Sequence, residues 1–346
     1  MKASFFFSLI ILTFSLSVFA QDSIPKAKIK PEIKSKSSHK VFANIFTGAY
    51  YNFKTKKPNA GFELSTALLG YRFQKSDNLQ FTIIYDVTRT TGGIHVTDSA
   101  GNNLPIKYFA GSEYTAFLKM AEIKWYFAPK FSLSAGQLLN EQYLTKQDKI
   151  WGHRYVMTTM QELFRMANPA DFGMRIEYRD KDKLAWSLGA NNGNGPFYKQ
   201  DTLDIIEYTS NLEIYLIKDL LIKGYIALTP ATFETENNLK TAFSGFIAYQ
   251  KKKYKIGLEY SYTKNINFTD YHYSGTSGFI SYNINPKWEV FARYDYVDQS
   301  SVAQYENVYV GGFQYQPQDQ LFLSLNYRYW SKAEIQQIYF NLGAKF

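Results

Sequence analysis

Apolar and polar residues alternate along several long segments of this chain. Residues 254–264 read YKIGLEYSYTK, in which every second residue is Tyr, Ile or Leu and the residues between are charged, Gly, Ser or Thr. Residues 171–180 (DFGMRIEYRD) and 321–330 (LFLSLNYRYW) repeat the pattern. Because successive side chains of a β-strand point to opposite faces, each segment has one apolar and one polar wall. The pattern predicts an all-β chain from residue 41 to residue 346.

A soluble β-sandwich alternates as well, and segment length separates the two classes. These segments run to about 9–13 residues, the reach of a tilted strand across a bilayer, whereas strands of soluble sheets have about 5–6. The connections alternate between short polar turns and longer loops, as they do in outer-membrane barrels. The short turns lie at 75–78, 128–130, 179–183, 217–220, 251–253, 285–287 and 317–320, and the loops near 54–60, 91–112, 144–169, 192–202, 230–238, 265–272, 298–304 and 331–334. Together they predict a transmembrane antiparallel β-barrel of about sixteen strands, with both barrel ends on the short-turn side.

Aromatic content and the last segment agree with a membrane barrel. The chain contains 29 Tyr and 28 Phe, and aromatic residues make up 18% of it. Such a load suits a lipid-facing surface with aromatic belts at both interfaces and a polar lumen. The last segment alternates too and ends on Phe346. A terminal Phe on such a strand resembles the signal read by the outer-membrane assembly machinery, so Phe346 is the expected assembly signal.

The N-terminal residues precede the barrel. Lys2 supplies a positive charge ahead of an apolar run from Phe5 to Val18. The side chains of Val18-Phe19-Ala20 fit the site that a signal peptidase reads, so the sequence predicts a cleaved signal peptide over residues 1–20. The run is shorter than the roughly 20 residues of a spanning helix. Residues 21–40 are rich in Lys and poor in large apolar residues, so we expect a disordered basic segment in the periplasm.

Motifs of enzymes and cofactor sites are absent from the sequence. It has no Cys and only four His, and it contains no HExxH, nucleophile-elbow or calcium-loop pattern. The sequence therefore predicts no catalytic residues, no metal, no cofactor and no nucleic-acid partner. The net charge of +9 favours anionic solutes or reflects the basic N-terminal segment.

The segment 144–169 departs from alternation. Tyr155, Thr158 or Thr159, Leu163 and Met166 recur at near-helical spacing, and Thr158 is a candidate cap for a helix that ends before Pro169. A sixteen-stranded barrel encloses a wide lumen, which a loop folded inward would narrow. We therefore expect a short helical loop folded inward as a constriction, the alternative being a helix that caps the rim outside. The candidate constriction residues are Lys146, Lys149, Arg154, Glu162 and Arg165.

Charged residues on the polar walls are expected to face the lumen. The candidate lumen-facing charges are Arg175, Arg179, Lys255, Glu259, Arg293 and Arg328, with Lys119, Lys124, Lys223, Glu122, Glu177, Glu213, Glu289 and Asp295 among them. Mixed charges of this kind predict a modest selectivity rather than a tight site.

The stretch from Phe131 to Phe197 carries a family likeness. Its FSLSAGQ, WGHRYV, NPADFGMRIEYRD and LAWSLGANNGNGPF segments resemble the phosphate-selective (O/P-type) porin family and its relatives, in the Tyr-rich and Lys-rich style of Bacteroidetes-type outer-membrane porins. The resemblance implies a sixteen-stranded barrel, usually a homotrimer, with a lumen that attracts anions. Lumen cations are sparser here than in the specialised members, so it implies weak rather than strict phosphate preference.

The expected function is passive diffusion of small hydrophilic solutes across the outer membrane of a Gram-negative bacterium. The expected partners are outer-membrane lipid and lipopolysaccharide, the assembly machinery and small solutes, anions among them. Two alternatives remain open, a non-conducting structural or adhesin barrel and a barrel enzyme.

Overall fold

The computed structural model describes residues 37–54, 59–89, 94–97, 103–108, 114–180, 183–197, 200, 204–231, 239–300 and 304–346. The expected signal peptide (1–20) and most of the expected basic segment (21–40) lie outside these residues. The first strand begins at Ser38, not at Val41, because the backbones of Ser38, His39 and Lys40 already pair with the second strand. The barrel therefore includes three residues that the sequence assigned to the basic segment.

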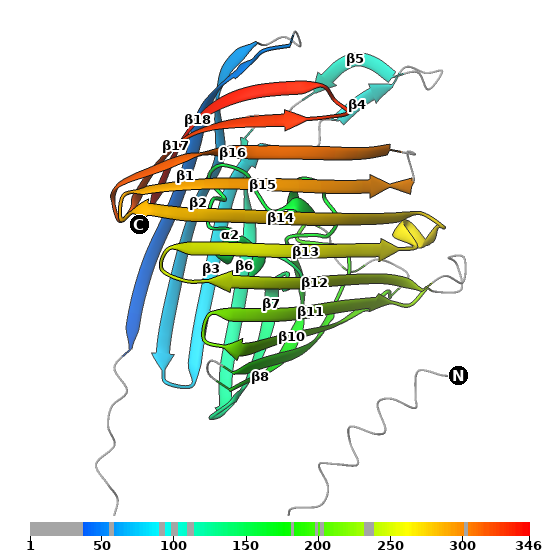
Figure 1. The fold of residues 1–346 in the computed structure, drawn as a ribbon. Coiled ribbons are helices and arrows are strands. Elements are labelled where there is room, and N and C mark those ends of the chain that lie inside the picture. Colours follow the sequence, from blue (N-terminus) through cyan, green and yellow to red (C-terminus); the bar gives the residue numbers. More distant parts are fainter. Residues whose placement is uncertain are drawn as a thin grey trace, which may run out of the picture. The chain divides into compact units, whose positions relative to one another are not determined.

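Sixteen strands form one closed antiparallel barrel (Figure 1). They are β1 (Ser38–Asn52), β2 (Ala60–Ser76), β3 (Leu79–Arg89), β6 (Tyr114–Ala128), β7 (Phe131–Leu139), β8 (Ala170–Asp180), β9 (Leu184–Asn191), β10 (Glu207–Ile217), β11 (Leu220–Thr229), β12 (Lys240–Gln250), β13 (Tyr254–Lys264), β14 (His272–Asn285), β15 (Trp288–Gln299), β16 (Gln304–Gln318), β17 (Leu321–Trp330) and β18 (Ile335–Lys345). Pairing of β1 with β18 closes the ring, so no strand is left with a free edge. The predicted fold class and strand number are confirmed.

Short turns and long loops occupy opposite ends of the barrel, as predicted. Turns such as 251–253 and 286–287 join neighbouring strands at the left of Figure 1, where β18 also ends. A separate two-stranded sheet, β4 (Ile94–Thr97) and β5 (Asn103–Tyr108), lies in the connection between β3 and β6. Among the described residues, no helix is long and apolar enough to cross a membrane.

The two faces of each strand differ as the alternation predicted. On β13, Leu258 points outward with 57% of its surface exposed, whereas Glu259, the next residue, points inward and is 5% exposed. The inward positions of the barrel are mostly polar or charged, and the outward positions are mostly Ile, Leu, Val and aromatic residues. An apolar face outside and a polar face inside suit a barrel whose solvent is lipid outside and water inside.

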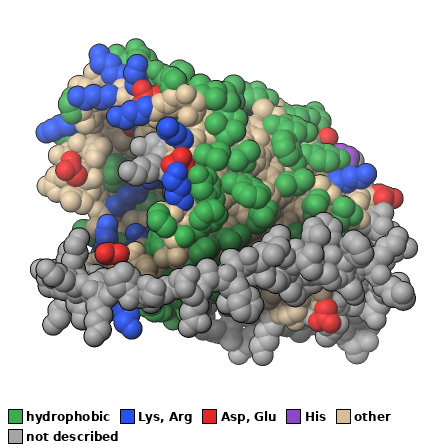
Figure 2. All heavy atoms as spheres, turned by 90° about the horizontal axis from the view of Figure 1, so that it is seen from below, with side chains coloured by type: hydrophobic (Ala, Val, Ile, Leu, Met, Phe, Trp, Pro, Cys, Tyr) green, Lys and Arg blue, Asp and Glu red, His purple; other side chains and the backbone are tan. Residues whose placement is uncertain are grey.

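Outward aromatic rings gather near both ends of the strands. Near the short turns, Trp288 lies 4.7 Å from Tyr315 between ring centres, and Tyr254 lies 5.1 Å from Tyr282. Near the long loops, Tyr329, the second-last residue of β17, lies 5.9 Å from Tyr309 between ring centres. Figure 2 shows a broad band of hydrophobic side chains across one face, with Lys and Arg gathered at its left end. Two aromatic belts around an apolar band are the surface expected of a membrane-spanning barrel.

Candidate pore constriction

The segment between β7 and β8, residues 140–169, folds into the barrel (Figure 1). We call it the inward loop. Five of its apolar residues join wall residues in one buried cluster: Ile150, Trp151, Tyr155, Val156 and Met157 pack with Phe46, Leu221, Phe246, Phe279, Phe291, Val308 and Val310. Burying each large side chain contributes about 1.5–3 kcal/mol, so the cluster holds the loop firmly on the wall. The loop lies inside the barrel and is not a helix that caps the rim.

The inward loop contains two short helices where the sequence predicted one. The helix α2 (Gln147–Trp151) ends at Gly152, which adopts a left-handed backbone with φ of 73°. The helix α3 covers only Met160–Leu163, and its N-cap is Thr159 rather than Thr158. The near-helical spacing of apolar residues reflects contact with the wall, since Tyr155 and Met157 are buried although both lie between the helices.

Wall cations bind backbone carbonyls of the inward loop. Arg293 on β15 donates from Nη1 to the oxygen of Thr158 at 2.6 Å, and Arg328 on β17 donates from Nη2 to the oxygen of Val156 at 2.6 Å. Lys223 on β11 donates to the side chain of Gln147 at 2.7 Å. Arg293 and Arg328 lie on the inward face and are only 4% and 6% exposed. These cations position the loop and are covered by it.

Two further wall residues from the predicted set also meet the loop. Glu259 accepts a hydrogen bond from the side chain of Gln161, and it is buried. Lys255 pairs with Glu289 at 3.0 Å, and Glu289 lies 3.5 Å from the ring nitrogen of His153 in the loop. The polar inner wall from β11 to β17 therefore mainly holds the loop in place, and we call it the seat of the loop.

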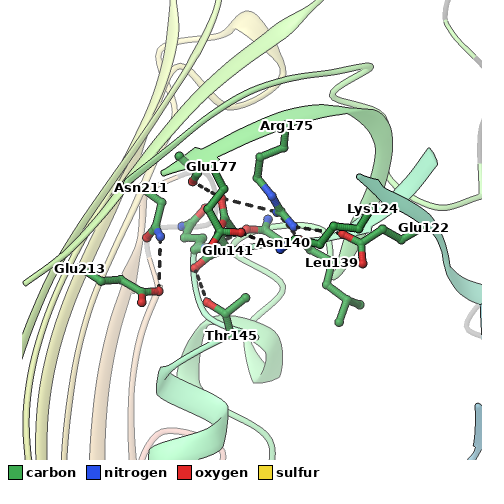
Figure 3. A network of polar contacts seen from close by, with 12 residues as sticks. Glu122, Lys124, Leu139, Asn140, Glu141, Thr145, Arg175, Glu177, Asn211 and Glu213 are labelled. Atoms are coloured by element: carbon green, nitrogen blue, oxygen red, sulfur yellow. Dashed lines mark hydrogen bonds and ion pairs between the residues drawn. The ribbon is translucent and has the colours of Figure 1, made fainter. Parts of the chain in front are cut away.

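A network of paired charges lies on β6, β8 and β10 (Figure 3). Lys124 pairs with Glu177 at 2.7 Å, and Arg179 pairs with the same carboxylate at 2.6 Å. Arg175 lies 3.5 Å from Glu141 of the loop and 3.9 Å from Glu122. Arg175 and Arg179 both lie on the inward face of β8, and each has a carboxylate within reach. Paired charges leave a weaker net field than the same cations would alone.

Arg154, one of the candidate constriction residues, forms ion pairs within the loop and does not stand free in water. It lies 3.0 Å from Asp148 and 2.5 Å from Glu162, both within the loop. Burial disfavours its charge, but the two carboxylates outweigh that effect and hold the pKa of the guanidinium well above its ordinary value. Lys146 is likewise held, at 3.2 Å from Glu213 on β10.

Lys149 and Arg165 are the exposed cations of the inward loop. Lys149 lies on the open side of α2, and Arg165 follows α3 in a left-handed conformation with φ of 54°. Within the described residues, neither side chain forms an ion pair with a carboxylate. Because α2 lies inside the barrel, the exposure of Lys149 places water next to the loop. Of the predicted constriction residues, these two carry uncompensated positive charge.

Sequence reasoning placed the start of the loop too late, at 144 instead of 140. It therefore missed Glu141, which binds Arg175 and accepts a hydrogen bond from Ser187 at 2.5 Å. It also missed Gln142 and Gln161, whose side chains join the two stems of the loop at 2.6 Å. The break in alternation after Leu139 is the one sequence signal that marks this start. In the part of the chain that the structure describes, no group of three or more His, Asp or Glu is placed to hold a metal ion.

No family model matches this chain, and no curated protein matches its sequence. Solved structures do match. The anion-selective porin from Comamonas acidovorans is 12% identical, with 90% of this chain and 100% of that chain covered and a TM-score of 0.64. OmpF of Salmonella typhi is 9% identical, with 90% and 98% covered and a TM-score of 0.64. This chain has the porin fold.

Structures with this porin fold are varied in kind. The outer membrane channel DcaP of Acinetobacter baumannii is also similar, at 11% identity, with 90% of this chain and 97% of that chain covered and a TM-score of 0.60. At such identities the likeness shows the architecture of the barrel and no particular selectivity. The sequence resemblance to phosphate-selective porins thus agrees with the porin fold in general.

Proposed function

We propose that this chain is an outer-membrane porin of a Gram-negative bacterium, through which small hydrophilic solutes diffuse passively with a weak preference for anions. The observation that carries the proposal is the inward loop, which packs on the inner wall and keeps Lys149 and Arg165 exposed. A loop of this kind narrows the lumen. Passage through the remaining space needs no binding step or energy source.

The preference for anions is weak because most interior charges are paired. Arg154, Arg175 and Arg179 each have a carboxylate within 4 Å, whereas Lys149 and Arg165 are exposed. These two exposed cations, which have no ion-pair partner among the described residues, raise the local concentration of anions without forming a dedicated phosphate site. We further propose cleavage of residues 1–20, assembly through the C-terminal strand and a homotrimer in contact with lipid and lipopolysaccharide. The apolar run that ends in Val18-Phe19-Ala20 supports the cleavage, Phe346 on the last strand supports the assembly route, and the family resemblance supports the trimer.

One observation favours a second candidate, a barrel without conductance. The buried cluster under the inward loop joins Phe46 on β1, Phe291 on β15 and Val308 on β16, so it covers a wide part of the wall. A loop that filled the remaining lumen would make the barrel a structural or adhesive element.

Electrical recording in planar bilayers separates the two candidates. Purified protein that keeps its heat-modifiable electrophoretic mobility should insert in discrete steps of steady, ohmic current. Folded protein that inserts without current would contradict the porin and support the structural barrel.

The selectivity is tested by replacing Lys149 and Arg165 together with Gln. In a salt gradient, the reversal potential of this variant should move toward cations at 0.1 M salt and much less at 1 M, because the Debye length falls from about 10 Å to about 3 Å. Lys332, an exposed residue after β17, serves as the matched control when changed to Gln. Equal reversal potentials of the parent, the double variant and the Lys332 control would show that Lys149 and Arg165 do not cause the preference for anions.

A further inference from the structure

A cavity of about 230 Å³ lies between the stems of the inward loop and the wall of β8 to β13. We call it the vestibule cavity. Asn140 and Glu141 line it from one stem and Arg165 and Asn168 from the other. Arg175 and Glu141, two of its lining residues, point toward each other in Figure 3. The cavity is smaller than the roughly 300–1,000 Å³ of drug-sized sites, so it suits a solute of about one sugar ring.

Small side chains on the inward face of this part of the wall leave space for the cavity. In the strand register, Gly189 pairs with Thr209, Thr209 with Ala227, Ala227 with Ala242, and Ala242 with Thr263. This row crosses five strands, β9 to β13, on the inward face. None of its side chains is larger than Thr, so the wall leaves room where aromatic residues fill the neighbouring part under the loop.

Polar atoms without a protein partner line the vestibule cavity. In the described part of the chain, the Nε of Arg175 and the Oγ1 of Thr263 are buried and have no hydrogen-bond partner. Thr209 and Tyr225, which are 9% and 4% exposed, add two hydroxyl groups to the lining. Buried polar groups are usually hydrogen-bonded, so these atoms point to a polar solute.

The carboxylates of the lining are already occupied. Glu141 accepts from Ser187, and Asp171 accepts from the backbone nitrogens of Phe172 and Gly193. Glu207 accepts from Thr229 at 3.3 Å and lies 3.7 Å from Lys240. Each of these three carboxylates therefore has a protein donor, whereas the buried lining atoms that lack a partner among the described residues are the Nε of Arg175 and the hydroxyl of Thr263.

Arg165 adds a positive charge at the same cavity, and no carboxylate of the described residues forms an ion pair with it. Its left-handed backbone follows α3 directly, where Met166 donates from its nitrogen to the oxygen of Gln161 at 2.8 Å. We propose that the vestibule cavity is a binding site for a small carboxylate-bearing polyol, a solute of the sugar-acid class. Arg165 and Arg175 bind the carboxylate, and Thr209, Tyr225 and Thr263 bind the hydroxyls. The proposal deepens the proposed porin function by naming a solute class that the channel concentrates at its entrance.

Calorimetric titration of the folded full-length barrel in detergent tests the site without relying on conduction. The probes are D-galacturonate and D-galactose, which share a ring and differ in the carboxylate. Galacturonate should bind about tenfold more tightly or better, because hydrogen bonds to a charged group are the stronger ones. Equal affinities, or no measurable heat with galacturonate, would overturn the proposal.

Variants locate the binding. Arg165→Gln should weaken galacturonate about tenfold and leave galactose unchanged, whereas Thr263→Val should weaken both sugars. Lys264→Gln is the matched control, because Lys264 is the next residue on β13 and is exposed on the outer face. Binding that persists in both cavity variants would place the site elsewhere and overturn the proposal. Conductance without galacturonate binding would refute this site alone, and binding without conductance would refute the porin function alone.

Discussion

At the scale of single residues, most charges inside this barrel are paired. Neighbouring residues on one strand face opposite sides, one toward lipid and the next toward the interior. Leu258 faces outward, and Glu259 faces the inward loop and binds Gln161. Glu259 is therefore part of the seat of the loop and not a free group on the lumen wall. This difference gives a direct test of the facing of β13.

Leu258→Arg should destabilise the barrel by about 2–4 kcal/mol near the membrane midplane, because it places a charge in lipid. Glu259→Gln keeps the size of the side chain and its hydrogen bond, so its unfolding free energy should stay within about 0.5–1 kcal/mol of the parent. Urea unfolding in lipid vesicles measures both. Similar losses in the two variants would refute the assignment of the two faces.

Arg154 and Glu162 make the position of the inward loop depend on pH. Burial raises the pKa of Glu162, but Arg154 outweighs it, so that the pKa lies below its ordinary value of 4.5. The pair therefore contributes stability that is present above pH 4.5 and is lost as the pH falls through the lowered pKa. Fluctuations of the single-channel current should therefore begin only below pH 4.5, where Glu162 becomes protonated.

Arg154→Gln removes the cation and leaves Glu162 beside Asp148, which raises the pKa of Glu162. Current fluctuations should then begin at a higher pH than in the parent. Recording at a series of pH values checks the shift, and Lys332→Gln is again the control. An unchanged onset would mean that the Arg154 pair does not hold the loop.

At the scale of elements, the strands could be predicted from the sequence and the inward loop only in part. Strand facing depends on a period of two, which residues such as Leu258 and Glu259 display without any tertiary information. Partners far apart in the sequence depend on the closure of the barrel, and nothing local to Arg328 shows that it binds Val156. Asp148 and Glu162 lie within eight residues of Arg154, but no strand period places them around it. The inward fold of the loop was therefore predictable from its length, but its paired charges were not.

Removal of residues 147–164 should raise the single-channel conductance and let larger sugars pass in liposome-swelling assays. The barrel should still assemble, since the hydrogen bonds between its strands do not involve the loop. Removal of the β4–β5 hairpin, a separate two-stranded sheet, is the control and should change conductance less. A parental conductance in the 147–164 deletion would show that the loop does not limit the current.

At the scale of the whole molecule, closure depends on the last residues of the chain. Phe346 exchanges two backbone hydrogen bonds with Ala43 of β1, at 2.8 and 3.3 Å, and its side chain is 68% exposed. Phe346→Asp keeps these backbone groups and changes only the side chain. It should reduce the folded fraction in the outer membrane, as heat-modifiable mobility reports, whereas Phe346→Tyr should assemble normally. Normal assembly of the Asp variant would show that the side chain of Phe346 is not the assembly signal.

The seat of the inward loop also fixes an order of events during folding. The loop follows β7 in the chain, but it binds Gln314 through Tyr155 and is held by Arg328, across separations of 159 and 172 residues. The ring of Tyr155 also lies so close to Gly343 on β18 that an added Cβ would come within 2.9 Å of it. Contacts between residues so far apart along the chain form late, because long loops must close before they form. We therefore expect these contacts to form only after β16, β17 and β18 are in place, which would leave a newly closed barrel with a wider lumen until the loop has docked fully.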